Sequence, residues 1–236
     1  MAKLELKQED GIAIIIMDED DNRLTLGMCA SLMDMLDKIE KETEAVTLVV
    51  ASRHDRIWCN GFDTDWISAC KAENNLEPVK QFLSIDLELR KRLLTYPLIT
   101  IAAINGHVFG GGAVFSMCFD FRIMRLDRGF FCIPAIDRDF PMLPGTGTLL
   151  QSVMPMYMIE DAVLTGRRFT GAECAANHVV VNAYNNDELM EKVMTFARGL
   201  KKGRGIVKEM KKVINGRTLK LMEEDIRFIE KGELRV

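Results

Sequence analysis

The chain lacks the cysteine and histidine patterns that bind metal ions. Its six cysteines, at positions 29, 59, 70, 118, 132 and 174, include no CxxC pair, and its three histidines do not occur at ligand spacing. Several of the cysteines lie inside apolar runs, where a thiol behaves as a small hydrophobic side chain. We therefore expect no metal site and a reducing, cytoplasmic compartment.

Features typical of nucleic-acid-binding and membrane proteins are also missing. The formal net charge is −4, and the one basic stretch, Lys201–Lys212, is best interpreted as a solvated helix face. The first residues contain no apolar targeting segment. The run Leu98–Phe119 carries no Asp, Glu, Lys or Arg, but Asn105-Gly106 and a glycine triplet interrupt it. We expect neither nucleic acid nor a membrane as a partner.

Standard nucleotide-binding glycine motifs are absent, yet two glycine loops stand out. GxGxxG and GK[ST] do not occur. Glycine costs about 0.5–1 kcal/mol relative to alanine inside regular structure, so the triplet Gly110-Gly111-Gly112 needs a reason. It forms either a tight turn or a bare helix start where a substrate oxygen meets unpaired N–H groups. Gly61, in "WCNGFDTDW", would expose the Phe62 N–H in the same way.

The order of apolar segments predicts an α/β domain with a helical C-terminal region. We expect strands at 12–18, 45–52, 98–104 and 119–125, and helices at 28–42, 78–94, 111–118 and 204–231. In the last helix the expected packing residues are apolar: Ile206, Met210, Val213, Ile214, Leu221, Ile226 and Ile229.

The two loops together resemble those of a known family. "IWCNGFDTDW" followed by "ITIAAINGHVFGGG" is similar to the two motifs of the crotonase, or enoyl-CoA hydratase/isomerase, superfamily. "NGFD" before a tryptophan, and "RLDRGFF" downstream, look most like the Δ3,Δ2-enoyl-CoA isomerase branch. The resemblance implies a spiral of ββα units over residues 1–185. It also implies a C-terminal helical region, 186–236, used to form a homotrimer or hexamer.

The resemblance also implies a coenzyme A thioester substrate and no permanently bound cofactor. In the family, the residue after the first glycine and the middle glycine of the triplet supply two oxyanion N–H groups, here those of Phe62 and Gly111. The implied substrate-binding positions surround them: Asn60, Gly61, Asp63, Trp66, Gly110, Gly112, Val114 and Ala135. Asp63 also has the position of a helix cap.

The carboxylates that should accompany these loops are missing from their usual positions. The family's glutamates fall at Val114 and Ala135 in this chain, and the alternative isomerase carboxylate falls at Leu143. Hydration, which generally uses two glutamates, is therefore disfavoured. Proton transfer at carbon needs a positioned base, and Asp137 and Asp139 are the nearest replacements.

Two function classes remain open on the sequence. The first is an enzyme that isomerises a double bond through a thioester enolate held by the two N–H groups. The second is an acyl-CoA-binding protein that keeps the oxyanion loops without an acid or base. A different thioester reaction, such as hydrolysis or decarboxylation, is a variant of the first class.

Overall fold

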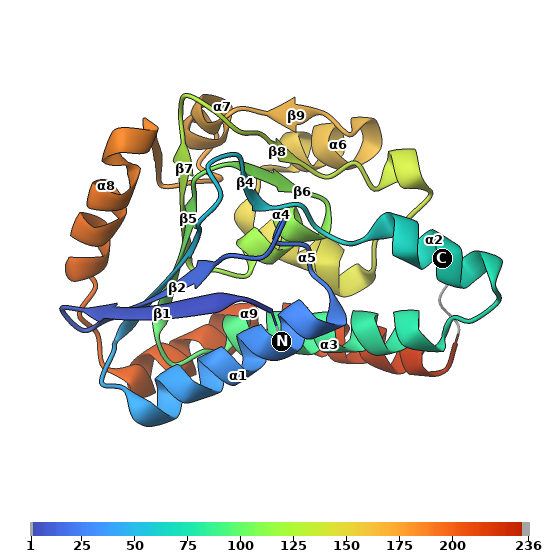
Figure 1. Cartoon of the computed structure of the whole chain (residues 1–236), viewed down its shortest axis with the longest axis horizontal. Coiled ribbons are helices and arrows are strands. Elements are labelled where there is room, and N and C mark those ends of the chain that lie inside the picture. The colour runs from blue at the N-terminus through green and yellow to red at the C-terminus, as the bar shows by residue number, and fades with distance from the viewer. Residues whose placement is uncertain (1, 233–236) are drawn as a thin grey trace.

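The larger of two β-sheets organises the chain, which a computed structural model describes over residues 2–232 (Figure 1). Its strands lie in the order β1-β2-β3-β5-β7-β10. β1 (Leu4–Glu9) and β2 (Ile12–Met17) are antiparallel, and Asp10 and Gly11 between them both have positive φ, as a two-residue hairpin turn requires. The other strands run parallel to β2: β3 (Thr47–Ser52), β5 (Ile99–Ile104), β7 (Phe121–Arg125) and β10 (Asn182–Tyr184).

Both faces of this sheet are buried, which explains why its strands are almost continuously apolar. Val49 and Ile101 belong to the cluster that packs under α8 (Asn186–Arg198), whereas Leu48 and Ala102 belong to the main core. Figure 1 shows α8 on one side of the sheet and the second sheet on the other. The side chains therefore alternate between two apolar layers, as the strand period demands.

A smaller sheet carries the loops that matter for function. β4 (Ile57–Cys59), β6 (His107–Phe109) and β8 (Phe131–Cys132) are parallel neighbours, and β9 (Arg168–Phe169) adds an antiparallel edge. Each strand has only two or three residues, and so these strands could not be predicted from apolar periodicity. Because β4 and β6 are parallel neighbours, the segments after them leave the sheet at the same edge.

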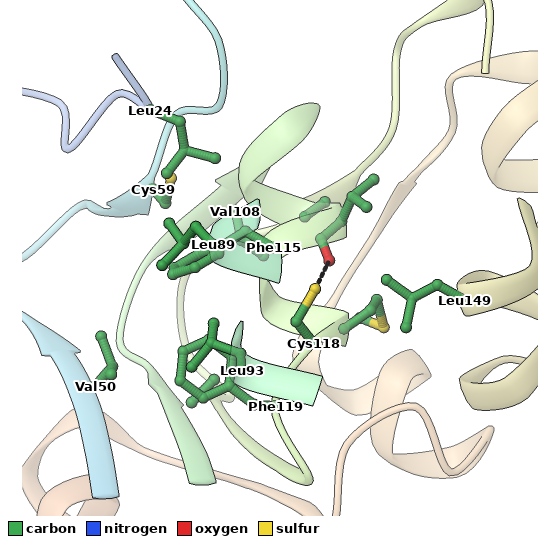
Figure 2. Close-up of a cluster of buried hydrophobic side chains, with 14 of the residues drawn as sticks. Leu24, Val50, Cys59, Leu89, Leu93, Val108, Phe115, Cys118, Phe119 and Leu149 are labelled. Atoms are coloured by element: carbon green, nitrogen blue, oxygen red, sulfur yellow. Dashed lines mark hydrogen bonds between the residues drawn. The ribbon is translucent and has the colours of Figure 1, made fainter. Parts of the chain in front are cut away.

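Helices enclose the main core between the two sheets. The long helices α1 (Leu26–Glu42), α3 (Glu77–Leu94) and α9 (Arg204–Glu230) run along one side of the molecule (Figure 1). Figure 2 shows side chains from several elements meeting in the core, with the Cys118 thiol donating to the Val114 carbonyl oxygen. The remaining helical elements are α2 (Thr64–Ala72), α4 (Gly111–Met117), η1 (Ile136–Arg138), α5 (Pro144–Val153), α6 (Met156–Thr165) and α7 (Gly171–Ala176).

The helices and strands predicted from the sequence are confirmed, but the expected packing face of the last helix is wrong in part. Ile206, Met210, Val213 and Ile214 are 57%, 56%, 82% and 76% exposed. The buried side of α9 instead includes the polar residues Lys211, Thr218 and Asp225. These find partners inside the fold, as Lys211 Nζ does at the Leu98 carbonyl oxygen, 2.8 Å away. An apolar pattern alone therefore mispredicted the orientation of α9.

The C-terminal segment packs onto the rest of the chain. α8 contacts β5, β7 and β10, and α9 contacts α3 and α5. Asp225 on α9 accepts a hydrogen bond from the Gly145 N–H at the start of α5, at 2.8 Å. Among the described residues, no helix is long and apolar enough to cross a bilayer.

Candidate active site

The two glycine loops lie in direct contact. Gly61 follows β4 and has φ of +77°, a conformation that L side chains rarely adopt. A β-carbon placed there would lie 2.4 Å from the Phe109 carbonyl oxygen and 2.9 Å from the Gly111 nitrogen. Only glycine fits this approach of two backbones, and so Gly61 acts by bringing the loops together.

Two backbone N–H groups remain free beside this contact. Gly111 is the first residue of α4, where an N–H has no partner within the helix. Phe62 forms an isolated bridge with Leu24 in which the Leu24 N–H donates to the Gly61 carbonyl oxygen. Within residues 2–232, neither the Phe62 N–H nor the Gly111 N–H donates to a protein acceptor. Both are available to a ligand oxygen.

A cavity of about 520 Å³ opens beside these two residues. Its walls come from the two glycine loops, from α3, and from the segment between β8 and α5. Leu83, Leu87, Phe140 and Met142 give the cavity an apolar lining, to which Arg23, Arg138 and Arg168 add charge. An apolar cavity with a few convergent polar groups is the usual form of a small-molecule site.

Most of the sequence-predicted site residues line this cavity. Those that do are Asn60, Phe62, Gly110, Gly111, Val114, Ala135 and Asp137, and Leu143 joins them. The other residues predicted to bind substrate are Gly61, Asp63, Trp66 and Gly112, which are not among the lining residues. The predicted base Asp139 is also absent from the lining.

The residues outside the lining have structural contacts that explain their positions. The Asp63 carboxylate accepts a hydrogen bond from the Trp66 N–H at 3.2 Å and caps α2, as its sequence position predicted. The Trp66 ring packs edge-on against Phe82. A β-carbon at Gly112 would lie 2.7 Å from the Cys59 sulfur, so that glycine provides room for β4.

The three expected carboxylate positions all face the cavity. Val114, Ala135 and Leu143 are lining residues, and Val114 is buried. The three predicted positions therefore lie at the cavity, but they carry apolar side chains. Because no glutamate occupies these positions, they cannot support hydration by a pair of glutamates.

The two aspartates predicted as replacements differ in their placement. Asp137 lies in η1 and lines the cavity, where its Oδ2 atom would lie 2.6 Å from a β-carbon added at Gly166. Asp139 is exposed and adopts a left-handed conformation with φ of +49°. Of these two, Asp137 has the better access to a bound ligand.

Similarity to known proteins agrees with this arrangement. Residues 7–232 match the family described as enoyl-CoA hydratase/isomerase. The chain belongs to this family. The resemblance predicted from the two loops is thereby confirmed, and the fold is the crotonase fold with two sheets and a long C-terminal helix. The family acts on coenzyme A thioesters without a fixed cofactor.

Curated relatives of this chain have names that refer to different reactions. Enoyl-CoA delta isomerase 3 of Arabidopsis thaliana is 24% identical over 178 residues, 75% of this chain and 74% of the relative. Carnitinyl-CoA dehydratase of Salmonella arizonae is 32% identical over 138 residues, 57% of this chain and 52% of that protein.

Solved structures establish the fold over nearly the whole chain. A probable enoyl-CoA hydratase from Mycobacterium tuberculosis has a TM-score of 0.87 at 19% identity and covers 97% of this chain and 95% of its own. Human mitochondrial delta3-delta2-enoyl-CoA isomerase has a TM-score of 0.83 at 17% identity, covering 98% and 93% of the two chains.

The structure adds to this cavity an ion pair that the sequence did not predict. Asp86 and Arg90 lie one turn apart on α3, line the cavity, and are 2% and 3% exposed. Arg90 Nη2 lies 2.7 Å from Asp86 Oδ2. The signal was present in the sequence, because residues 79, 83, 86, 90 and 93 form one helical stripe that is otherwise apolar.

Cys132, at the cavity, and His107, in the turn after Asn105-Gly106, have structural contacts. The Cys132 thiol donates to the Gly166 carbonyl oxygen at 3.2 Å, and burial raises its pKa, so the nucleophilic thiolate is disfavoured. The His107 ring stacks on Phe109 and lies outside the cavity lining. In the described part of the chain, no cluster of His, Cys, Asp and Glu side chains could hold a metal ion.

Proposed function

We propose that this protein moves the double bond of an enoyl-CoA thioester through an enolate. The observation that carries the proposal is the pair of unpaired N–H groups, on Phe62 and Gly111, at one cavity. A thioester carbonyl oxygen that accepts both hydrogen bonds becomes a better electron sink, so the neighbouring C2–H becomes more acidic. Losing one such donor typically costs about 2.7–4 kcal/mol of transition-state stabilisation.

The reaction balances with a single base. A base removes a proton from C2 of a 3-enoyl-CoA, and the electron pair spreads over C2 to C4 and the thioester oxygen. The same proton then returns to C4, and the double bond comes to lie between C2 and C3. No water is added, which suits a cavity whose aligned positions are Val114, Ala135 and Leu143.

The lining also suits an acyl chain. Leu83, Leu87 and Met142 would pack against its carbons, and burying each CH₂ group contributes about 0.8 kcal/mol. The similarity to plant enoyl-CoA delta isomerases supports the same reaction.

The test is a spectrophotometric assay of purified protein with short and medium-chain 3-enoyl-CoA, run beside calorimetric titration with the same ligands. Conversion to the 2-enoyl product supports the isomerase. Asp137→Asn and Asp139→Asn then show whether either predicted aspartate supplies the base, which requires turnover to be lost while binding persists.

A second function is favoured by the apolar residues at Val114, Ala135 and Leu143. The protein would then bind acyl-CoA without transforming it. Binding in the calorimeter with no conversion in the assay supports this reading and excludes isomerisation.

We further propose that α9 carries the contact between copies of this chain in a homotrimer or hexamer. Ile206, Met210, Val213 and Ile214 follow the spacing of one helical face and are all more than half exposed. Val213→Asp with Ile214→Asp should reduce the mass measured by analytical ultracentrifugation. Lys208→Asp, which changes charge without removing apolar surface, serves as the control.

A further inference from the structure

We infer that Asp86 is the base that carries the proton between C2 and C4, and that Arg90 is its positioning residue. This inference rests on the proposed isomerisation and names the group which that reaction lacks. It assigns chemistry to a side chain on α3, away from the segments where the family's glutamates and the two predicted aspartates lie.

Asp86 is the buried carboxylate of the cavity. Among the described residues, the lining carboxylates are Asp65, Asp86 and Asp137, and both Asp65 and Asp137 are exposed. Leu83 and Leu87, the neighbours of Asp86 on the same helix, also line the cavity. A carboxylate in this apolar wall would meet a bound acyl chain out of water, where its electrostatic interactions with the reacting atoms are stronger.

One oxygen of Asp86 is held and the other is free. Oδ2 pairs with Arg90 Nη2 at 2.7 Å, whereas Oδ1 is buried and has no partner within residues 2–232. An unpaired buried acceptor is unfavourable unless something uses it. A proton shuttle needs an oxygen without a partner, and Oδ1 is the oxygen that this ion pair leaves unpaired.

Arg90 connects the pair to the oxyanion loop. Its guanidinium carbon lies 5.7 Å from the centroid of the Phe62 ring. That ring packs edge-on against Phe82, on α3, with centroids 4.9 Å apart. The base and a residue of the proposed oxyanion hole are therefore held by one packed unit of α3 side chains.

The groups around Asp86 have opposing effects on its pKa. Burial raises its pKa, and the Arg90 guanidinium opposes that rise. The thiols that interact with this pair are those of Cys29, Cys59 and Cys118; burial raises the pKa of Cys29 well above its ordinary value and the pKa of Cys59 and of Cys118 to about 12. All three thiols stay neutral near pH 7. A base works best when its pKa approaches the working pH.

The first test compares Asp86→Asn with Asp137→Asn in the isomerase assay, with Glu88→Gln as an exposed control on the same helix. Asp86→Asn should lower kcat by about 10²–10⁴-fold. Titration with a saturated acyl-CoA of equal chain length should show unchanged affinity, which demonstrates an intact cavity. Full turnover in a folded Asp86→Asn protein would overturn the inference.

The second test identifies the role of Arg90 and separates chemistry from scaffolding. Replacing the cation in Arg90→Met raises the pKa of its carboxylate partner. The acidic limb of the kcat profile, where activity is lost as pH falls, should therefore move to higher pH. A purely structural pair would change the amount of folded protein and leave the limb in place, contradicting the inference.

A third measurement distinguishes failure of the inference from failure of the proposed function. Exchange of the C2 hydrogens of a saturated acyl-CoA with deuterium oxide, followed by NMR, needs a base and an oxyanion hole but no double bond. Exchange without isomerisation, lost in Asp86→Asn, would support the base and overturn the isomerase. Exchange that survives Asp86→Asn would overturn the base.

Discussion

The Phe62 ring lies over the α-carbon of Gly111, and a β-carbon added at Gly111 would be 2.4 Å from Phe62 Cε1. The ring has little room to withdraw, since Phe82 and Phe140 pack against it with centroids 4.9 Å and 5.9 Å away. The spacing of the two loops therefore depends on the absence of a side chain at Gly111 as well as at Gly61.

Gly111→Ala should separate the two N–H groups and reduce turnover in the isomerase assay. Misplacing one oxyanion donor is worth about 10²-fold or more in kcat. Gly147→Ala is the matched control, because a β-carbon on this helical glycine meets no atom within 4 Å. Equal activity of the two variants would show that the loop spacing does not govern the reaction.

Asp225→Ala should destabilise the protein by about 1–3 kcal/mol, because it leaves the buried Gly145 N–H without an acceptor. The free energy of unfolding from urea titration measures this effect. Glu224→Ala changes the adjacent, exposed carboxylate and should stay within about 0.5 kcal/mol of the wild type. A similar loss in both variants would argue against a specific Asp225–Gly145 bond.

Lys211→Met should be far more costly than Lys212→Met. Lys211 Nζ reaches both the Leu98 carbonyl oxygen and Asp120 Oδ2, at 2.8 Å and 2.5 Å, and tethers α9 to the larger sheet. Losing hydrogen bonds from a charged group costs about 1.5–3 kcal/mol. Lys212 is half-exposed and pairs with the exposed Glu209, so its loss should cost about 0.2–0.5 kcal/mol. Thermal unfolding of the two variants makes the comparison.

Asp127 should give the fold a small acid sensitivity. Hydrogen bonds from the Arg125 guanidinium, at 3.0 Å and 2.7 Å, lower the pKa of this carboxyl to about 2. In the unfolded chain the same group titrates near about 3.9, so between these values the unfolded state binds more protons. The contribution of Asp127 is present above about pH 4 and is lost as the pH falls towards 2.

The test compares the wild type with Asp127→Asn by urea titration at pH 7 and pH 3. The stability advantage of the wild type should be smaller at pH 3. Because Asp127 is partly exposed, solvent screening keeps the effect modest. A pH-independent difference would mean that the contact acts through geometry alone.

How well each strand or helix can be predicted from the sequence depends on the length of its apolar pattern. The buried strands at 47–52 and 99–104 and the helix at 77–94 carry strong periodic signals and were predicted. The strands β4, β6, β8 and β9 are too short for any periodicity and exist through pairing between distant segments. The two glycine loops were nevertheless found, because the backbone contact restricts their residue types.

The buried charges were harder to predict for a physical reason. Asp86 and Arg90 are spaced four residues apart, which on most helices indicates a solvated ion pair. Lys211 similarly belongs to a basic stretch that was predicted to be a solvated helix face, although the Leu98 carbonyl oxygen and Asp120 accommodate it inside. Whether such a charged side chain is exposed or buried depends on its neighbours in the folded structure, which the sequence pattern does not show.

The six buried cysteines can report local unfolding of the elements that contain them. They are distributed over α1, β4, α2, the end of α4, β8 and α7, and each is at most 8% exposed. A thiol-specific reagent therefore reacts slowly with the folded protein. Its rate of reaction at each cysteine reports how often local unfolding exposes the element that contains it. Mass spectrometry of partly labelled protein would rank these regions by local stability without any introduced probe.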